Sequence, residues 1–104
     1  MKFTVNGYEW KITFVNGNEP KMNADGKLQF GLTEFIEQKI SIRDDLSDRA
    51  TRTTVIHELG HCFLFVYGID SGIYDEEAMC NFFGSYADAI LDLTNKFLKE
   101  RGVN

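Results

Sequence analysis

The sequence predicts an α+β domain in which a small, mainly antiparallel and twisted sheet packs on two helices. Before residue 44, apolar and polar residues alternate in short runs, which is typical of strands with one buried face. From residue 48 onward, apolar residues instead recur at helical spacing in two long runs. The chain has 104 residues, 43% of them hydrophobic, which suffices for one domain with a core but not for two. We therefore expect residues 1–104 to form a single domain.

Four short strands are expected before the first helix. The runs at residues 3–5 and 8–15 flank Asn6-Gly7, a dipeptide that readily adopts the positive φ angles of a tight hairpin turn. The apolar side chains that alternate onto one face of the second run, and should be buried, are Tyr8, Trp10, Ile12 and Phe14. Two more runs alternate at residues 28–32 and 39–43, and the short connections favour antiparallel pairing. Residues 16–26 hold the only proline and three asparagines, so they should form a surface loop.

Two helices are expected after residue 47. The first extends from about Asp48 to Tyr67 with Ser47 as its N-cap, and from Val55 onward it is apolar on nearly every side, which predicts burial. The second starts near Asp75 and extends to about residue 100. Its apolar stripe, which should pack on the core, consists of Met79, Phe82, Tyr86, Leu93 and Phe97. A narrower polar or small face carries Glu77, Asn81, Gly84 and Asp88.

Both histidines of the chain lie in one H-E-x-x-H motif, His57-Glu58-Leu59-Gly60-His61, on the first expected helix. Residues four apart on a helix share a face, with Cβ atoms about 5–6 Å apart, so His57 and His61 can direct both imidazoles at one metal ion. Glu58 would flank that ion, take a proton from the attacking water as general base and pass it to the leaving amine. The motif therefore predicts one Zn²⁺ per chain and zinc metallopeptidase activity.

A catalytic zinc ion has three protein ligands, and the chain has no third histidine, so a carboxylate or a thiolate must complete the set. The second helix opens with Asp75-Glu76-Glu77. We favour Glu77 because Asn81, which can hydrogen-bond a histidine, and Gly84, which permits close helix approach, share its face. Glu76 remains the alternative ligand. The structural interpretation of all three acidic residues is a favourable interaction with the helix dipole.

The remaining polar and sulfur-containing residues receive no catalytic role. Tyr74 and Tyr86 are the candidates for a second electrophile, but Tyr86 lies on the stripe expected to be core, and neither is assigned. Cys62 and Cys80 form no C-x-x-C pair and are interpreted as small buried residues. Cys62 should also point away from the ligand face of its helix.

Charge and hydropathy exclude several classes of partner. Sixteen acidic and eleven basic residues give a net charge of −5, which argues against binding to nucleic acid or to an anionic membrane surface. The first residues hold no apolar run of signal-peptide length, and no segment approaches the roughly 18 apolar residues of a membrane span. We therefore expect a cytoplasmic protein whose partner is a protein or peptide substrate.

Three segments carry a resemblance to a known family. They are Lys39-Ile40-Ser41-Ile42-Arg43, the segment from Thr53 to His61, and Glu77-Ala78-Met79-Cys80-Asn81-Phe82-Phe83-Gly84. Together they resemble the ImmA/IrrE-type metallopeptidases, gluzincin-like proteins common in bacteria and their phages. The resemblance implies a minimal zincin fold, with His57, His61 and Glu77 as zinc ligands and Glu58 as catalytic base. It also implies an intracellular protein substrate, such as a repressor or another regulator, bound as an extended strand along a sheet edge.

The chain also differs from the usual pattern of this family. Family members often continue the glutamate helix into a Leu-Leu-x-Pro ending and carry DNA-binding or sensor domains; this chain has neither and resembles a small phage- or prophage-type member. The expected function is hydrolysis of peptide bonds in an intracellular protein by a zinc-activated water. The alternative is a non-catalytic, zinc-stabilised protein-binding domain with a zincin fold. Glu58 favours the enzyme, because a purely structural zinc site has no use for that carboxylate.

Overall fold

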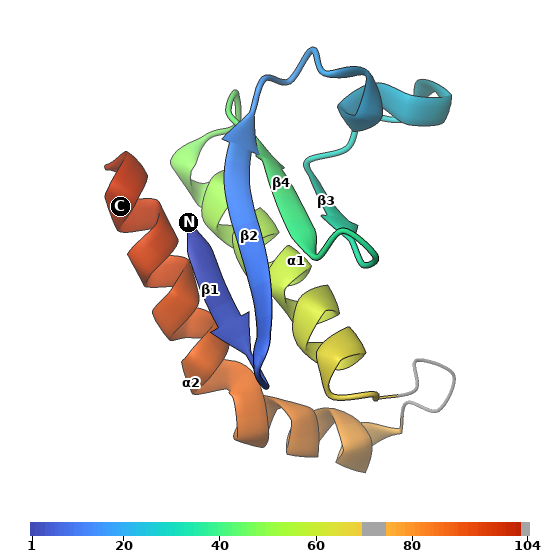
Figure 1. Ribbon diagram of the computed structural model, residues 1–104, viewed down its shortest axis with the longest axis vertical. Helices are drawn as coiled ribbons and strands as arrows, with labels where there is room; N and C mark the ends of the chain where they lie inside the picture. The colour runs from blue at the N-terminus through green and yellow to red at the C-terminus, as the bar shows by residue number, and fades with distance from the viewer. Residues whose placement is uncertain (70–74, 103–104) are drawn as a thin grey trace.

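The computed structural model describes residues 1–69 and 75–102 and shows a four-stranded mixed sheet followed by two helices that pack against it (Figure 1). The elements are β1 (Lys2–Val5), β2 (Tyr8–Val15), the 3-10 helix η1 (Pro20–Gly26), β3 (Gly31–Glu34), β4 (Lys39–Arg43), α1 (Asp48–Val66) and α2 (Glu76–Arg101). The predicted α+β class and the order of strands and helices are confirmed. Among the described residues, no helix is both long enough and apolar enough to cross a membrane.

Local sequence signals account for the ends of several elements. The Asn6-Gly7 turn between β1 and β2 has φ angles of 49° and 83°, as the predicted hairpin requires. The Oγ atom of Ser47 accepts a hydrogen bond from the backbone N–H of Ala50 at 3.2 Å, which caps α1 as predicted. Asp75 caps α2 in the same way, because its carboxylate accepts a hydrogen bond from the N–H of Ala78 at 2.7 Å.

The strands are ordered β1-β2-β4-β3 across the sheet, and the central pairing differs from the expectation. β1 pairs antiparallel with β2 and β3 pairs antiparallel with β4, whereas β2 and β4 are parallel, with Ile12 opposite Ile40. The expectation of antiparallel pairing was wrong for this pair, because residues 16–38 include η1 and β3 and are long enough to return the chain to the same end of the sheet. β3 thereby becomes an edge strand.

The segment before β3 also differs in detail from the prediction. β3 begins at Gly31, so the alternating residues Leu28 and Phe30 precede the strand, and their side chains are exposed. In η1, the side chain of Met22 is fully buried, so residues 16–26 form a partly packed segment instead of a simple surface loop. The backbone N–H of Gln29 donates to the carbonyl of Met22 at 2.8 Å, which joins η1 to the approach to β3.

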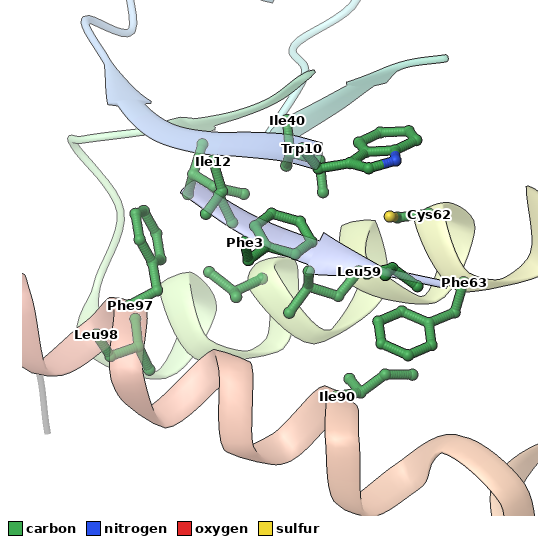
Figure 2. Close-up of a cluster of buried hydrophobic side chains, with 13 residues drawn as sticks. Phe3, Trp10, Ile12, Ile40, Leu59, Cys62, Phe63, Ile90, Phe97 and Leu98 are labelled. Carbon is green, nitrogen blue, oxygen red and sulfur yellow. The ribbon is translucent and has the colours of Figure 1, made fainter. Parts of the chain in front are cut away.

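The hydrophobic core lies between the sheet and the two helices. Figure 2 shows its main members, which are Phe3, Trp10, Ile12 and Ile40 of the sheet, Leu59, Cys62 and Phe63 of α1, and Ile90, Phe97 and Leu98 of α2. Trp10 and Ile12 are buried as predicted for β2, and Phe14 stacks on Phe97 with ring centroids 4.6 Å apart. Tyr8 is exposed, contrary to the prediction, at the hairpin end of β2.

Burial along α2 is concentrated in its second half. The buried residues of this helix are Ile90, Thr94, Phe97 and Leu98, and those partly buried against the core are Phe82, Tyr86 and Leu93. Met79 is 48% exposed, so its assignment to the packed stripe was wrong. The first turns of α2 contribute little to the core, and the side chain of Met79 in these turns is exposed to solvent.

The two cysteines differ in their surroundings. Cys62 is fully buried in the core, and burial raises the pKa of its thiol to about 12. At neutral pH this thiol stays protonated, which suits the packing role predicted for it and neither metal binding nor nucleophilic attack. Cys80 is exposed on α2, so the expectation that it is a small buried residue was wrong.

Candidate metal centre

One turn of α1 brings together the side chains of His57, Glu58 and His61. One ligand atom from each of these residues lies within 4.8 Å of the other two. The Nε2 atoms of His57 and His61 are 3.1 Å apart, and the two rings meet nearly edge to face, with an interplanar angle of 79°. Both histidines are exposed, whereas Glu58 is only 7% exposed. The H-E-x-x-H spacing therefore produces the convergence of imidazoles that was predicted from helix geometry.

The distance between the two imidazoles is compatible with zinc. Zinc–nitrogen bonds are about 2.0–2.1 Å long, so two nitrogens on a tetrahedral zinc ion lie about 3.3 Å apart. The observed Nε2–Nε2 distance of 3.1 Å is close to this value. Without a metal ion, the same distance fits a hydrogen bond in which one ring donates and the other accepts, according to their tautomers. The spacing of the two histidines therefore fits two ligands of one zinc ion.

The carboxylate of Glu58 is held against β3. The hydroxyl of Thr33 donates a hydrogen bond to its Oε1 atom at 2.8 Å and also lies 3.3 Å from the backbone carbonyl oxygen of Glu58. The other carboxylate oxygen, Oε2, is 3.8 Å from Nε2 of His57. Glu58 therefore lies beside the imidazoles with one oxygen bound by Thr33 and the other directed toward the histidine side.

Gly31 allows this close approach between β3 and α1. A Cβ atom added at this position would lie 2.7 Å from Cγ of Glu58 and 2.8 Å from Cγ2 of Thr54. Such distances are shorter than real Cβ contacts, so a larger residue would force the side chains of Glu58 and Thr54 to shift. Neither Gly31 nor Thr33 was assigned a role from the sequence. The sequence pattern places both residues on one face of a strand. It does not indicate which helix residue packs against that face.

The centre lies in a cleft between α1 and β3. One part of the cleft has a volume of about 300 Å³ and is lined by Phe30, Gly31, Thr53, Thr54, His57 and Glu58, together with Gln29. The adjoining part, of about 250 Å³, shares His57 and Glu58 and adds His61, Leu32, Thr33 and Phe35. Because β3 is an edge strand, the cleft follows one border of the sheet.

Glu77, the predicted third ligand, does not join this group. Both Glu76 and Glu77 are exposed in the first turn of α2, and neither belongs to the group that His57, Glu58 and His61 form among the described residues. Asn81 is exposed as well. The ligand role of Glu77 therefore stays a prediction.

The packing of the helices explains this separation. α2 contacts α1 through Tyr86 and Phe63, whose rings lie 5.9 Å apart. At 3.6 residues per turn, Phe63 is about 200° around α1 from His61, so α2 packs on the side away from the histidines. Nothing lies within 4 Å of a Cβ atom added at Gly84, so the expectation that this glycine permits close helix approach was wrong.

Of the two tyrosines considered as a second electrophile, only Tyr86 lies among the described residues. Tyr74 lies outside the described residues. Tyr86 is partly buried and stacks on Tyr67 with ring centroids 4.5 Å apart, in an aromatic cluster that also contains Phe63 and Phe82. This packing agrees with the structural interpretation of Tyr86 as a core residue.

No protein-family model, curated protein or solved structure matches the chain. The resemblance of its motifs to the ImmA/IrrE-type metallopeptidases therefore stays a prediction.

Proposed function

We propose that this protein is a zinc-dependent metallopeptidase that hydrolyses peptide bonds of a protein substrate. The observation that carries the proposal is the convergence of two imidazole Nε2 atoms beside a buried carboxylate, in a cleft along an edge strand. His57 and His61 would hold the ion, with Glu77 as the predicted third ligand and a fourth position left for water. The burial of Glu58 and its hydrogen bond from Thr33 support the role of general base.

In the proposed hydrolysis, the zinc ion, Glu58 and Thr33 would have different roles. A bound zinc ion would supply Lewis acidity to the scissile carbonyl and lower the pKa of the attacking water. Glu58 takes the proton of that water and passes it to the leaving amine. The hydroxyl of Thr33 occupies Oε1, so Oε2 of Glu58, on the side of His57, is the oxygen free to accept the proton.

β3 is an edge strand of the sheet in the part of the chain that the structure describes, and its outer border suggests how a substrate binds. An extended peptide can add to an exposed strand through backbone hydrogen bonds and place alternate side chains in flanking pockets. β3 runs directly past Glu58, so a peptide along its outer edge would bring a carbonyl group close to the histidines. The resemblance to the ImmA/IrrE-type proteins suggests an intracellular regulator as this substrate.

Thr33→Val should lower kcat by about tenfold or more without changing zinc affinity. Valine keeps the β-branched shape but leaves Oε1 of Glu58 without its donor, and hydrogen bonds to charged groups contribute about 1.5–3 kcal/mol. Steady-state kinetics and zinc titration of the same preparations measure both effects. Thr33→Ser, which keeps the hydroxyl, is the matched control and should retain most of the activity. An unchanged kcat in the valine variant would contradict this role of Thr33.

The proposed function is tested by incubating the purified protein with a panel of denatured and native proteins and analysing the products by mass spectrometry. We expect cleavage that stops on addition of a zinc chelator and returns when zinc is restored. Tight zinc binding with no cleavage of any panel member would instead favour the non-catalytic, zinc-stabilised domain. Cleavage that resists the chelator would show that the hydrolysis does not depend on metal.

A further inference from the structure

An exposed apolar surface continues the cleft beyond the histidines. Phe65 lies one helical turn after His61, which itself lies one turn after His57, so the three residues share one face of α1. The ring of Phe65 is 52% exposed, and its centroid lies 4.9 Å from that of Phe35, in the turn after β3. Trp10 of the core meets Phe65 nearly edge to face at 6.4 Å. The surface therefore packs on a buried side chain of the core.

This surface encloses a pocket. Its volume is about 390 Å³, and it is lined by Tyr8, Phe35, Ile36, Gln38, Phe65 and Val66. None of these six side chains is charged, and five of them are largely apolar. Phe35 also lines the part of the cleft that holds His57, Glu58 and His61, so the pocket adjoins that part of the cleft at Phe35.

We propose that this pocket selects the substrate of the metallopeptidase by taking one large aliphatic or aromatic side chain of the bound peptide; the inference rests on the proposed function. A charged side chain would lose its hydration there without gaining a charged partner among the six lining residues. An apolar side chain would instead cover Phe65 and Ile36, which is 88% exposed.

The geometry of β3 sets the position of that side chain in the substrate. Thr33 lies beside Glu58, and Phe35, which lines both the cleft and the pocket, follows two residues later. In an extended chain, two residues span about 6.6–6.8 Å, and the four residues of α1 from His61 to Phe65 span about 6.0 Å. A peptide lying along β3 therefore presents to the pocket a side chain one or two residues from the scissile bond, on one side of it only.

The test uses a peptide library prepared by digesting a bacterial proteome, with cleavage sites identified by mass spectrometry. We expect the wild-type protein to enrich large apolar residues at a single position, one or two residues from the cut. Synthetic peptides with leucine at that position should show kcat/KM at least about tenfold higher than the same peptides with alanine.

Two matched variants assign the preference to the pocket. Ile36→Asp places a charge in the lining of the pocket, in an exposed turn, and the leucine-to-alanine ratio should fall toward one. Leu91→Asp changes an exposed apolar residue of α2 that does not line the pocket, and it should keep the wild-type ratio.

Three other results would contradict the inference, and each identifies which claim has failed. Cleavage without apolar enrichment, or enrichment that Ile36→Asp does not alter, refutes the pocket and leaves the metallopeptidase activity standing. No cleavage of any peptide by the wild-type protein refutes the proposed function and the inference with it. A dimer in sedimentation analysis that Ile36→Asp converts to a monomer, with an unchanged cleavage pattern, would assign the surface to contact between two copies of the chain.

Discussion

Glu58→Gln should abolish hydrolysis and leave the metal in place. General acid–base catalysis contributes about 10²–10⁴-fold to enzymatic rates, and glutamine cannot accept the proton of the attacking water. The substitution keeps the size of the side chain in the narrow space against Gly31, and its amide oxygen can still accept the hydrogen bond from Thr33. We therefore expect the variant to fold normally and to bind one zinc ion per chain.

The measurement compares cleavage of one panel substrate by the wild-type protein and the Glu58→Gln variant, with zinc content determined on the same samples. Glu37→Gln is the matched control, because Glu37 is an exposed residue in the turn between β3 and β4 and should tolerate the change. Undiminished cleavage by Glu58→Gln would refute the assignment of the general base. Loss of zinc together with loss of activity would make Glu58 a metal ligand instead.

The second large effect is expected from Glu77→Ala, which should lower zinc affinity by more than about 100-fold. Removal of groups that only hydrogen-bond a zinc ligand typically costs about 10–100-fold in metal affinity, and removal of a direct ligand should cost more. Glu76→Ala is the control, because Glu76 lies in the same exposed first turn of α2. Competition with a chromogenic zinc chelator measures both affinities.

The two variants also test whether the start of α2 reaches the zinc ligands of α1. The group of His57, Glu58 and His61 does not include Glu77, so binding through Glu77 requires the start of α2 to approach the ligand face of α1. Equal losses in Glu77→Ala and Glu76→Ala, or a larger loss in Glu76→Ala, would show that the third ligand has been misassigned. Unchanged affinity in both variants would place the third ligand outside this turn.

The features that could be predicted from the sequence depend on neighbouring residues. The Asn6-Gly7 hairpin, the Ser47 cap and the spacing of His57 and His61 each follow from chemistry within about one turn of the chain. These features can be predicted from the sequence because they do not depend on contacts between residues far apart in the chain. The burial expected for α1 from Val55 onward is confirmed on the face of Val55, Leu59, Cys62 and Phe63. It was wrong for Phe65, which is 52% exposed on the histidine face of the helix.

The features that escaped prediction depend on contacts between distant residues. The parallel pairing of β2 with β4 depends on how residues 16–38 cross the sheet, and strand periodicity does not encode that path. Thr33 and Gly31 acquire their importance only because β3 lies against Glu58, 25 positions after Thr33 in the sequence. Met79 and Cys80 were misjudged for a related reason, since their burial depends on where α2 leaves the core.

Zinc stoichiometry of the purified chain is the decisive measurement for the proposed centre. Elemental analysis should find one zinc ion per chain, and removal of that ion should lower the unfolding temperature, because a ligand that binds only the folded state stabilises it. The double substitution of His57 and His61 by alanine should abolish both the bound zinc and its effect on unfolding. A wild-type protein that contains no zinc, takes up none and unfolds at the same temperature with or without it would contradict the proposed metal centre.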